Sequence, residues 1–184
     1  MAESTLTETN PADSALITRW LDGDERAATF LVERHARSLS RFVASLGVRG
    51  DVEEVVQDTF VRAFGALDQF RAESSLRTWL FTIARNLVRD RIRSARVRRD
   101  TVPIEESDSV TEGDALDETV AEETAHRLRL AVHRLTPMQR EVFTLRVSEG
   151  MSYREIAQVL GSTEGAARVH YFNAMRSVKE FIDD

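Results

Sequence analysis

The sequence predicts an all-α protein made of two small helical domains that are joined by a flexible acidic linker. Apolar residues recur at helical spacing along most of the 184 residues, and helix-start and helix-stop signals separate the stripes. Only three prolines and eight glycines are present, and no segment shows the alternating β-branched pattern of a strand. A chain of this length fits one domain or two small ones.

The distribution of charge places the boundary between the two domains. Residues 71–99 contain nine arginines and two acids, whereas residues 100–123 contain ten acids and no basic residue. The acidic stretch also contains a proline, a glycine and several serines and threonines, which is typical of a flexible linker. The expected organisation is a disordered polar tail over 1–11, a first domain over 12–99, a linker over 100–120 and a second domain over 121–184.

The composition argues against several classes of protein. There are no cysteines, which excludes disulfides, thiolate zinc sites and cysteine nucleophiles. No apolar run approaches the roughly 20 residues that cross a bilayer, and the polar N-terminus is unlike a signal peptide, so we expect a cytoplasmic protein without membrane insertion. The four histidines are scattered and no phosphate-binding loop is present, so we expect no metal, no cofactor and no enzymatic activity.

The first domain is expected to be helical throughout. One helix has an inward stripe of Leu31, His35, Leu39, Phe42 and Leu46, and it ends at Gly47. We interpret His35 as a packed core residue, because no second metal ligand follows it at helical spacing. The next helix, capped by Asp51, directs these residues inward: Val52, Val55, Val56, Phe60, Ala63 and Leu67. Its outward residues are Glu53, Glu54, Gln57, Asp58 and Arg62.

A loop over residues 68–75 leads to a long helix with a strongly basic outer face. Its inward stripe is Leu76, Trp79, Leu80, Ile83 and Leu87, with Ile92 as a further candidate. Its expected outer face carries Arg85, Arg89, Arg93 and Arg96, with Asn86 beside them. Because these arginines have almost no acidic partners four residues away, the pattern favours a surface that follows phosphates over a merely solvated helix face.

Two helix starts in the second domain share one pattern. Thr136 and Ser152 can each cap a helix, and Gln139 and Glu155 stand three residues on to return the hydrogen bond. Gly161 ends the second of these helices, and a longer helix follows after a tight turn. A short helix, a tight turn and a longer helix form a helix-turn-helix, which places its second helix in the DNA major groove.

The apolar spacing of this longer helix indicates which face is free. Its inward stripe is Ala167, Tyr171, Ala174 and Val178. An exposed Phe172 beside Arg168 fits a DNA-reading helix better than a solvated face of a small bundle. The residues expected to point outward, toward DNA, are Glu164, Arg168, Val169, Phe172, Asn173 and Arg176.

Three segments of the chain closely resemble bacterial RNA polymerase sigma factors. They are residues 51–71 (DVEEVVQDTFVRAFGALDQFR), 75–99 (SLRTWLFTIARNLVRDRIRSARVRR) and 135–181. The most specific signatures are Val-Gln-Asp-Thr-Phe and Thr-Trp-Leu-Phe-Thr-Ile-Ala-Arg-Asn, in this order. The compact two-domain form resembles the extracytoplasmic-function (ECF) group.

The resemblance implies that the protein binds core RNA polymerase, directs it to promoters and helps to open the −10 element. By resemblance, Glu54, Gln57 and Asp58 dock on the clamp helices of the β′ subunit. The residues that resemble the lining of a pocket for an unstacked −10 base are Phe70, Arg71, Ser74, Ser75 and Asn86, while Arg85, Arg89 and Arg93 hold phosphates. Trp79 also matches a family position, but it lies on the inward stripe and is assigned to the core.

The second domain, by the same resemblance, reads the −35 element and contacts the β-subunit flap. Many relatives have Ser at the position of Val169 and Arg at those of His170 and Asn173, and residues 121–184 contain as many acids as bases. A weaker grip on the −35 element is therefore expected. The resemblance also implies an anti-sigma factor as a partner, an acidic linker that threads toward the polymerase's nucleic-acid channels, and a monomer outside the holoenzyme.

Two other classes of function remain open at this point. A DNA-binding regulator would use the helix-turn-helix without polymerase, which leaves the outward face around Gln57 unexplained. An enzyme or a purely structural bundle has no supporting motif in the sequence. The promoter sequence and the inducing signal do not follow from the residues.

Overall fold

The computed structural model describes residues 12–48, 52–101 and 120–183, and throughout these ranges every regular element is helical. The expected tail, the cap at Asp51 and most of the expected linker lie outside the described residues. The α-helices of the described residues are α1 Asp13–Leu21, α2 Glu25–Ser45, α3 Val52–Gly65, α4 Leu76–Thr101, α5 Val120–Arg134, α6 Pro137–Phe143, α7 Tyr153–Leu160 and α8 Glu164–Asp183. A 3₁₀ turn, η1 Leu67–Gln69, follows α3, and a π-helical turn, η2 Thr144–Ser148, follows α6. The predicted all-α class is confirmed.

The first half of the molecule, residues 12–101, is built around α2. The predicted stripe of this helix is buried at Leu31, His35, Leu39 and Phe42. His35 is a packed core residue, as predicted: its Nε2 lies 3.0 Å from Asp13 Oδ2 on α1. Burial lowers the pKa of His35 and outweighs the opposing attraction of Asp13.

Helix α4 is buried on two sides, whereas the sequence predicted one inward stripe. Leu76, Leu80 and Leu87 pack toward α3, as expected. A second set of buried residues on α4 consists of Phe81, Ala84, Arg85 and Val88. The second set follows helical spacing and turns toward α7, with which α4 is in extensive contact. The N-terminal part of α4 therefore lies between α3 of the first half and α7 of the second half.

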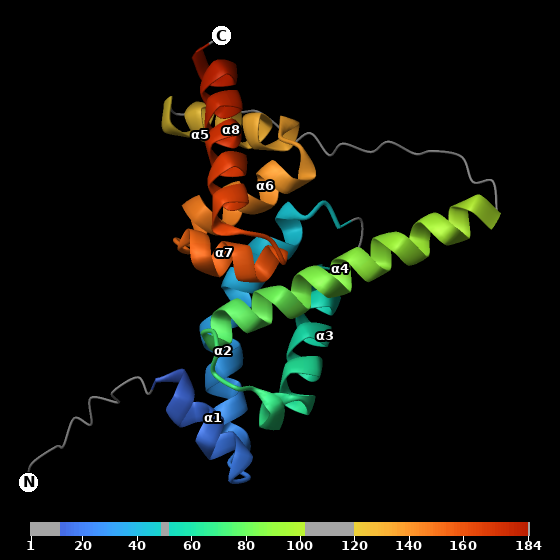
Figure 1. Cartoon of the computed structure of the whole chain (residues 1–184), viewed down its shortest axis with the longest axis vertical. Helices are drawn as coiled ribbons and strands as arrows, with labels where there is room; N and C mark the ends of the chain where they lie inside the picture. The colour runs from blue at the N-terminus through green and yellow to red at the C-terminus, as the bar shows by residue number, and fades with distance from the viewer. Residues whose placement is uncertain (1–11, 49–51, 102–119, 184) are drawn as a thin grey trace, which may run out of the picture.

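The second half, residues 120–183, contains the predicted helix-turn-helix. Both capping boxes are present: Thr136 and Gln139 bond reciprocally at the start of α6, and Ser152 and Glu155 do so at the start of α7. Gly161 ends α7 with φ of 61°, in the left-handed region that favours glycine. The turn then leads directly into α8, which crosses α6 and α7 (Figure 1).

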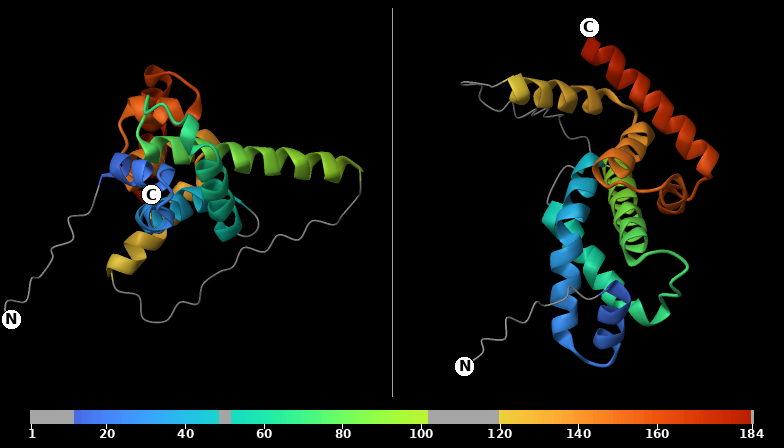
Figure 2. Two further views of the ribbon diagram at one scale, coloured as in Figure 1. Left: turned by 90° about the horizontal axis from the view of Figure 1, so that it is seen from below. Right: turned by 90° about the vertical axis from the view of Figure 1, so that its left-hand side faces the viewer.

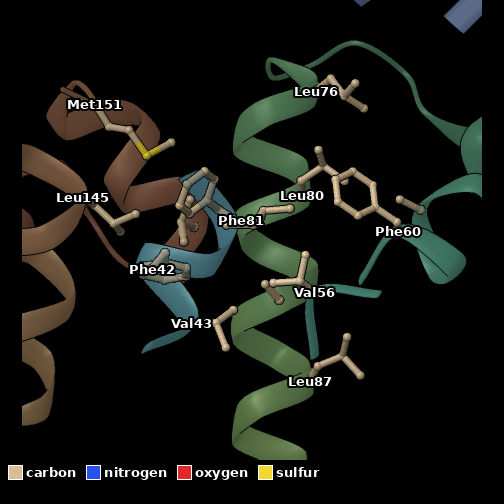
Figure 3. Packing of buried hydrophobic residues seen from close by; sticks show 14 of the residues in the cluster. Phe42, Val43, Val56, Phe60, Leu76, Leu80, Phe81, Leu87, Leu145 and Met151 are labelled. Carbon is tan, nitrogen blue, oxygen red and sulfur yellow. The ribbon is translucent and has the colours of Figure 1, made fainter. Parts of the chain in front are cut away.

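The two halves share one continuous apolar core. The rings of Phe42 on α2 and Phe81 on α4 lie 4.9 Å apart between centroids. Leu145 and Met151, from the second half, are fully buried against the same cluster (Figure 3). Figures 1 and 2 show that the C-terminal half of α4, by contrast, projects away from the other helices. The N-terminal half of α4 thus holds the halves together, whereas Arg89, Ile92 and Arg93 in its C-terminal half are exposed.

Candidate polymerase and nucleic-acid interface

The predicted docking residues share the outer face of α3. Gln57 is exposed, and the side chains of Glu54 and Asp58 keep 59% and 45% of their surface in solvent. The sequence analysis missed Arg91 on α4, whose Nη2 lies 2.9 Å from Glu54 Oε1 and 2.6 Å from Asp58 Oδ2. Arg91 partly neutralises this acidic face, and no local sequence pattern links the two helices.

The loop before α4 forms a compact structure with the first turn of that helix. The half-buried ring of Phe70 lies 5.1 Å from Trp79, which belongs to the packed side of α4, as predicted. Ser75 Oγ accepts a hydrogen bond of 3.1 Å from the backbone N–H of Thr78, so Ser75 caps α4. Ala72 has φ of 54°, an uncommon value for a residue other than glycine, which gives the loop a sharp bend.

The other predicted −10 residues divide into two groups. Arg71 is exposed and Ser74 is half-buried, and both belong to the loop. Asn86 is also exposed, but it stands ten residues into α4, about 15 Å along the helix axis from the first residue. Asn86 therefore lies further along the helix that begins after the loop, and its contact with a −10 base stays a prediction.

Arg85 contradicts its prediction. It was expected on the outer face with Arg89 and Arg93, which are exposed, yet its side chain is only 6% exposed. Its Nε lies 2.5 Å from Glu141 Oε2, and its Nη1 donates a 3.2 Å hydrogen bond to the carbonyl of Leu160. The physical reason is the second buried side of α4, which carries position 85 toward the second half.

The outward face of α8 agrees with the prediction, except that Asn173 is half-buried. Val169 and Phe172 are 59% and 66% exposed, so two large apolar side chains face solvent. Arg168 Nη2 lies 3.7 Å from Glu164 Oε2, and the guanidinium carbon of Arg168 lies 5.3 Å from the ring centroid of Tyr153. Together with Arg176 near the middle of the helix, these residues form one continuous face.

The basic residues of the α8 face each have an acidic neighbour. Arg176 Nε lies 3.8 Å from Glu180 Oε1, and Arg168 pairs with Glu164 one turn before it. Pairs of this kind on an exposed helix face contribute only tenths of a kcal/mol to stability. Their main consequence is that α8 offers little uncompensated positive charge.

A buried ionic cluster joins the two halves, and the sequence analysis did not find it. The carboxylate of Glu149, between η2 and α7, is only 1% exposed and accepts hydrogen bonds from Ser38, Arg41 and Arg77. Burial raises the pKa of Glu149, but the hydrogen bonds from Arg41, Ser38 and Arg77 outweigh it and hold the pKa below its ordinary value. Glu149 is therefore a buried carboxylate that is charged at neutral pH.

The described residues offer neither a metal-binding cluster nor a membrane span. Within the described ranges, no group of three or more histidine or acidic side chains is arranged to hold a metal ion. Among the same residues, none of the helices combines the length and the apolar character that a membrane span requires.

The fold and its outward faces define a two-part helical protein with a helix-turn-helix in the second part. Comparison with protein families matches the first part to Sigma-70 region 2 over residues 31–98 and the second to Sigma-70, region 4 over residues 125–178. The chain is 31% identical to the ECF RNA polymerase sigma-E factor of Escherichia coli (strain K12), over 90% of this chain and 92% of that protein. It is 28% identical to the ECF RNA polymerase sigma-E factor of Haemophilus influenzae, over 92% of this chain and 95% of that protein.

Solved structures give the same result. CnrH in complex with the cytosolic domain of CnrY is similar with a TM-score of 0.68 and 32% identity, covering 94% of this chain and 98% of that one. The sigma factor RpoE in complex with the anti-sigma factor NepR, from Bartonella quintana, is similar with a TM-score of 0.65 and 26% identity, covering 80% of this chain and 91% of that one. The chain therefore belongs to the ECF RNA polymerase sigma factors, and the predicted resemblance is confirmed.

Membership of this family decides between the alternatives left open by the sequence. Sigma factors are transcription initiation factors, and the regulator that acts without polymerase finds no support among the relatives.

Proposed function

We propose that this protein binds core RNA polymerase in the cytoplasm, directs it to a set of promoters and helps to open their −10 element. The observation that carries the proposal is the presence of both sigma regions in one chain, with the outer faces of α3 and α8 exposed together with Arg89 and Arg93 of α4. The protein acts as a specificity subunit and performs no catalysis itself.

Docking on polymerase uses the outer face of α3. Glu54, Gln57 and Asp58 present two carboxylates and an amide to the clamp helices of β′. Complementary charge at such a rim mainly sets orientation and the association rate. Because Arg91 already pairs with both carboxylates, a basic residue of β′ competes with Arg91 for them. The amide of Gln57 is the part of this face that meets the partner without such competition.

Recognition of the −10 element uses the loop and helix α4. Phe70, with Arg71, Ser74 and Ser75, surrounds an unstacked base, because the loop combines an aromatic ring with small polar side chains. Asn86 contacts a second position along the strand, since it stands about 15 Å further along α4. Arg89 and Arg93 hold the strand's phosphates from the projecting half of the helix.

Recognition of the −35 element uses α8 in the major groove. The residues of this face are Glu164, Arg168, Val169, Phe172, Asn173 and Arg176. Arg168 is held by Glu164 and Tyr153, which limits its motion before DNA arrives. Because both arginines have acidic neighbours, this helix contributes more to reading bases than to gripping the backbone. The β-subunit flap holds the second half in place.

An anti-sigma factor regulates the protein. This proposal is supported by the similar structure of RpoE, which was solved in complex with the anti-sigma factor NepR. One copy of the chain acts in each holoenzyme, and the acidic linker enters the polymerase's nucleic-acid channels.

An electrophoretic mobility shift tests the proposed function. With the chain alone, promoter duplex is expected to shift weakly, because each half is small and the two halves pack against each other in the free chain, whereas core polymerase fixes both on one promoter. With core polymerase added, a specific and heparin-resistant complex is expected. Tight promoter binding by the isolated chain that is unchanged by core enzyme contradicts the proposal.

A further inference from the structure

The contact between the two halves has an unusual chemical composition. Glu149, from the second half, is almost completely buried, and all three side chains that donate to its carboxylate come from the first half. Arg41 binds with two nitrogens, Nε at 3.0 Å from Oε1 and Nη2 at 3.2 Å from Oε2. Arg77 Nη2 lies 2.9 Å from Oε2 and 2.5 Å from the backbone carbonyl of the same glutamate. The donors converge from α2 and α4.

A second ion pair between an arginine of the first half and a glutamate of the second half lies on α4 and α6. Arg85 of α4 binds Glu141 of α6 and the carbonyl of Leu160 at the end of α7. In both pairs the first half supplies the cations and the second half supplies the anions. Without the second half, the first half displays a hydroxyl and three guanidinium groups on one side of α2 and α4, which we call the arginine site: Ser38, Arg41, Arg77 and Arg85.

The arginine site has the composition of a phosphate-binding site. Guanidinium groups bind carboxylates and phosphates with the same paired donor geometry, and a serine hydroxyl adds a further donor. Arg77 is the second residue of α4, immediately after the loop that the proposed function assigns to the −10 strand. DNA backbone is therefore the anion that reaches this site once it is uncovered.

The packed arrangement does not permit simultaneous contact with both promoter elements. By their names, the −35 and −10 elements are separated by about 25 base pairs, or roughly 85 Å of duplex at about 3.4 Å per pair. In the structure, α4 packs directly against α7 of the helix-turn-helix. The two halves must separate before one chain reaches both elements, and separation exposes the arginine site.

We propose that the arginine site is a DNA phosphate site, which Glu149 and Glu141 occupy in the closed chain and which the promoter strand occupies after the halves separate. The carboxylates hold the two halves together and keep the site from binding DNA before polymerase is present. The identity of the ligand rests on the proposed function, whereas the closure by Glu149 does not. The exchange of carboxylate for phosphate partly offsets the cost of opening.

The distance between the halves tests the closure. The chain has no cysteine, so Val61→Cys on α3 and Lys179→Cys on α8, both exposed, introduce a single pair of spin labels. Double electron–electron resonance is expected to give one narrow distance for the labelled parent and a longer, broader distribution for Glu149→Gln. The matched control is Glu180→Gln, an exposed glutamate of α8 within 4 Å of an arginine, for which no change is expected.

The affinity for DNA tests the ligand. With a fluorescent single-stranded 20-mer, Glu149→Gln is expected to bind about tenfold more tightly than the parent, the factor that accompanies loss of one charge-assisted hydrogen bond to the competing group. Arg41→Ala is expected to open the chain equally but to gain no affinity, because it removes part of the phosphate site. Equal gains for Glu149→Gln and Arg41→Ala overturn the phosphate assignment. An unchanged distance distribution in Glu149→Gln overturns the closure.

A substitute variant and a parallel transcription assay distinguish failure of this proposal from failure of the proposed sigma function. If Glu149→Gln loses its helical circular dichroism, Glu141→Gln carries the same test, since its partner Arg85 belongs to the same site. Promoter-specific transcription by the parent chain with core polymerase is measured in parallel. Absence of transcripts, with the expected distances and affinities, contradicts the sigma function and leaves the arginine site intact.

Discussion

The two DNA-facing helices differ in how they present charge. On the projecting half of α4, Arg89 and Arg93 are exposed, and Glu54 and Asp58 of the neighbouring α3 pair with Arg91. On α8, Arg168 and Arg176 each have a glutamate within 4 Å, and Val169 and Phe172 are the most exposed large apolar side chains of the helix. The difference supports the proposal that α4 mainly contacts the DNA backbone and α8 mainly contacts bases of the −35 element.

This division has a physical basis. Phosphate contacts position a protein on DNA without reporting sequence, whereas contacts to base edges report sequence and contribute less to salt-dependent affinity. We propose that this chain places its main phosphate contacts on the projecting half of α4 and its −35 base contacts on α8. Substitutions on the docking face, on α4 and on α8 test that separation. The first of them removes backbone contact and base reading together, because it detaches the chain from polymerase.

The largest expected effect is loss of polymerase binding. Changing Gln57→Ala together with Asp58→Arg should abolish association with core enzyme, because it inverts the charge at the centre of the docking face. Helicity should persist, since the Asp58–Arg91 pair is exposed and contributes little to stability. The measurement is co-purification with β′. The control is Glu33→Arg, a charge reversal at an exposed residue of α2 outside the docking face. A double variant that still co-purifies places the docking face elsewhere.

The next effect concerns the grip of α4. Replacing Arg89 and Arg93 by Ala should weaken holoenzyme binding by roughly 3–6 kcal/mol on every promoter, because each lost hydrogen bond to a charged group contributes about 1.5–3 kcal/mol. The slope of log affinity against log salt should fall by about 0.9 for each arginine. A salt titration measures both quantities, with Arg26→Ala as the control. A loss that depends on promoter sequence would assign base reading to α4 as well.

A smaller and more selective effect is expected on α8. Replacing Arg168 by Ala should cost roughly 1–3 kcal/mol on the best −35 sequence and relax the preference at one base pair. Binding to a panel of −35 variants gives the preference, and Lys179→Ala on the same helix serves as the control. If affinity falls equally on all sequences, Arg168 is a phosphate clamp and the reading falls to Phe172 and Asn173.

The smallest expected effect is on the stability of the helix-turn-helix. Hydrogen bonds from Ser152 lower the pKa of Glu155 below its ordinary 4.5. A lowered carboxyl pKa stabilises the fold above the ordinary value, and this contribution disappears as the pH falls through the lowered pKa. Ser152→Ala should cost about 1 kcal/mol at neutral pH and less at acid pH. Thermal unfolding of both chains from pH 7 to pH 3 measures the difference; a constant difference contradicts the role of Glu155.

Local patterns in the sequence predict the elements of this fold well. Capping boxes depend on residues three apart, so Thr136–Gln139 and Ser152–Glu155 are visible without a structure. The inward stripe of α8 is also local, and three of its four residues are fully buried. Residues three or four positions apart lie on the same side of a helix, so their contacts follow directly from their spacing in the sequence. The predictions that depend on such spacing are confirmed.

Contacts between distant elements are less accessible from the sequence. The second apolar stripe of α4, at Phe81, Ala84 and Val88, is visible as helical spacing, and it would have indicated that Arg85 is buried. Nothing local links Glu149 to Ser38 or Arg77, which are 111 and 72 residues away. Such a pairing depends on how two separately folded segments meet, which short-range periodicity does not encode.

Mapping of transcript starts tests the central claim most directly. Core polymerase and this chain, combined on genomic DNA in vitro, should produce starts that share two sequence motifs at a fixed spacing, one near −10 and one near −35. Core polymerase with the Gln57→Ala/Asp58→Arg chain should produce none of them. Starts that lack shared motifs, or that persist with the double variant, would contradict the account of this protein as a sigma factor that docks through α3 and reads promoters through α4 and α8.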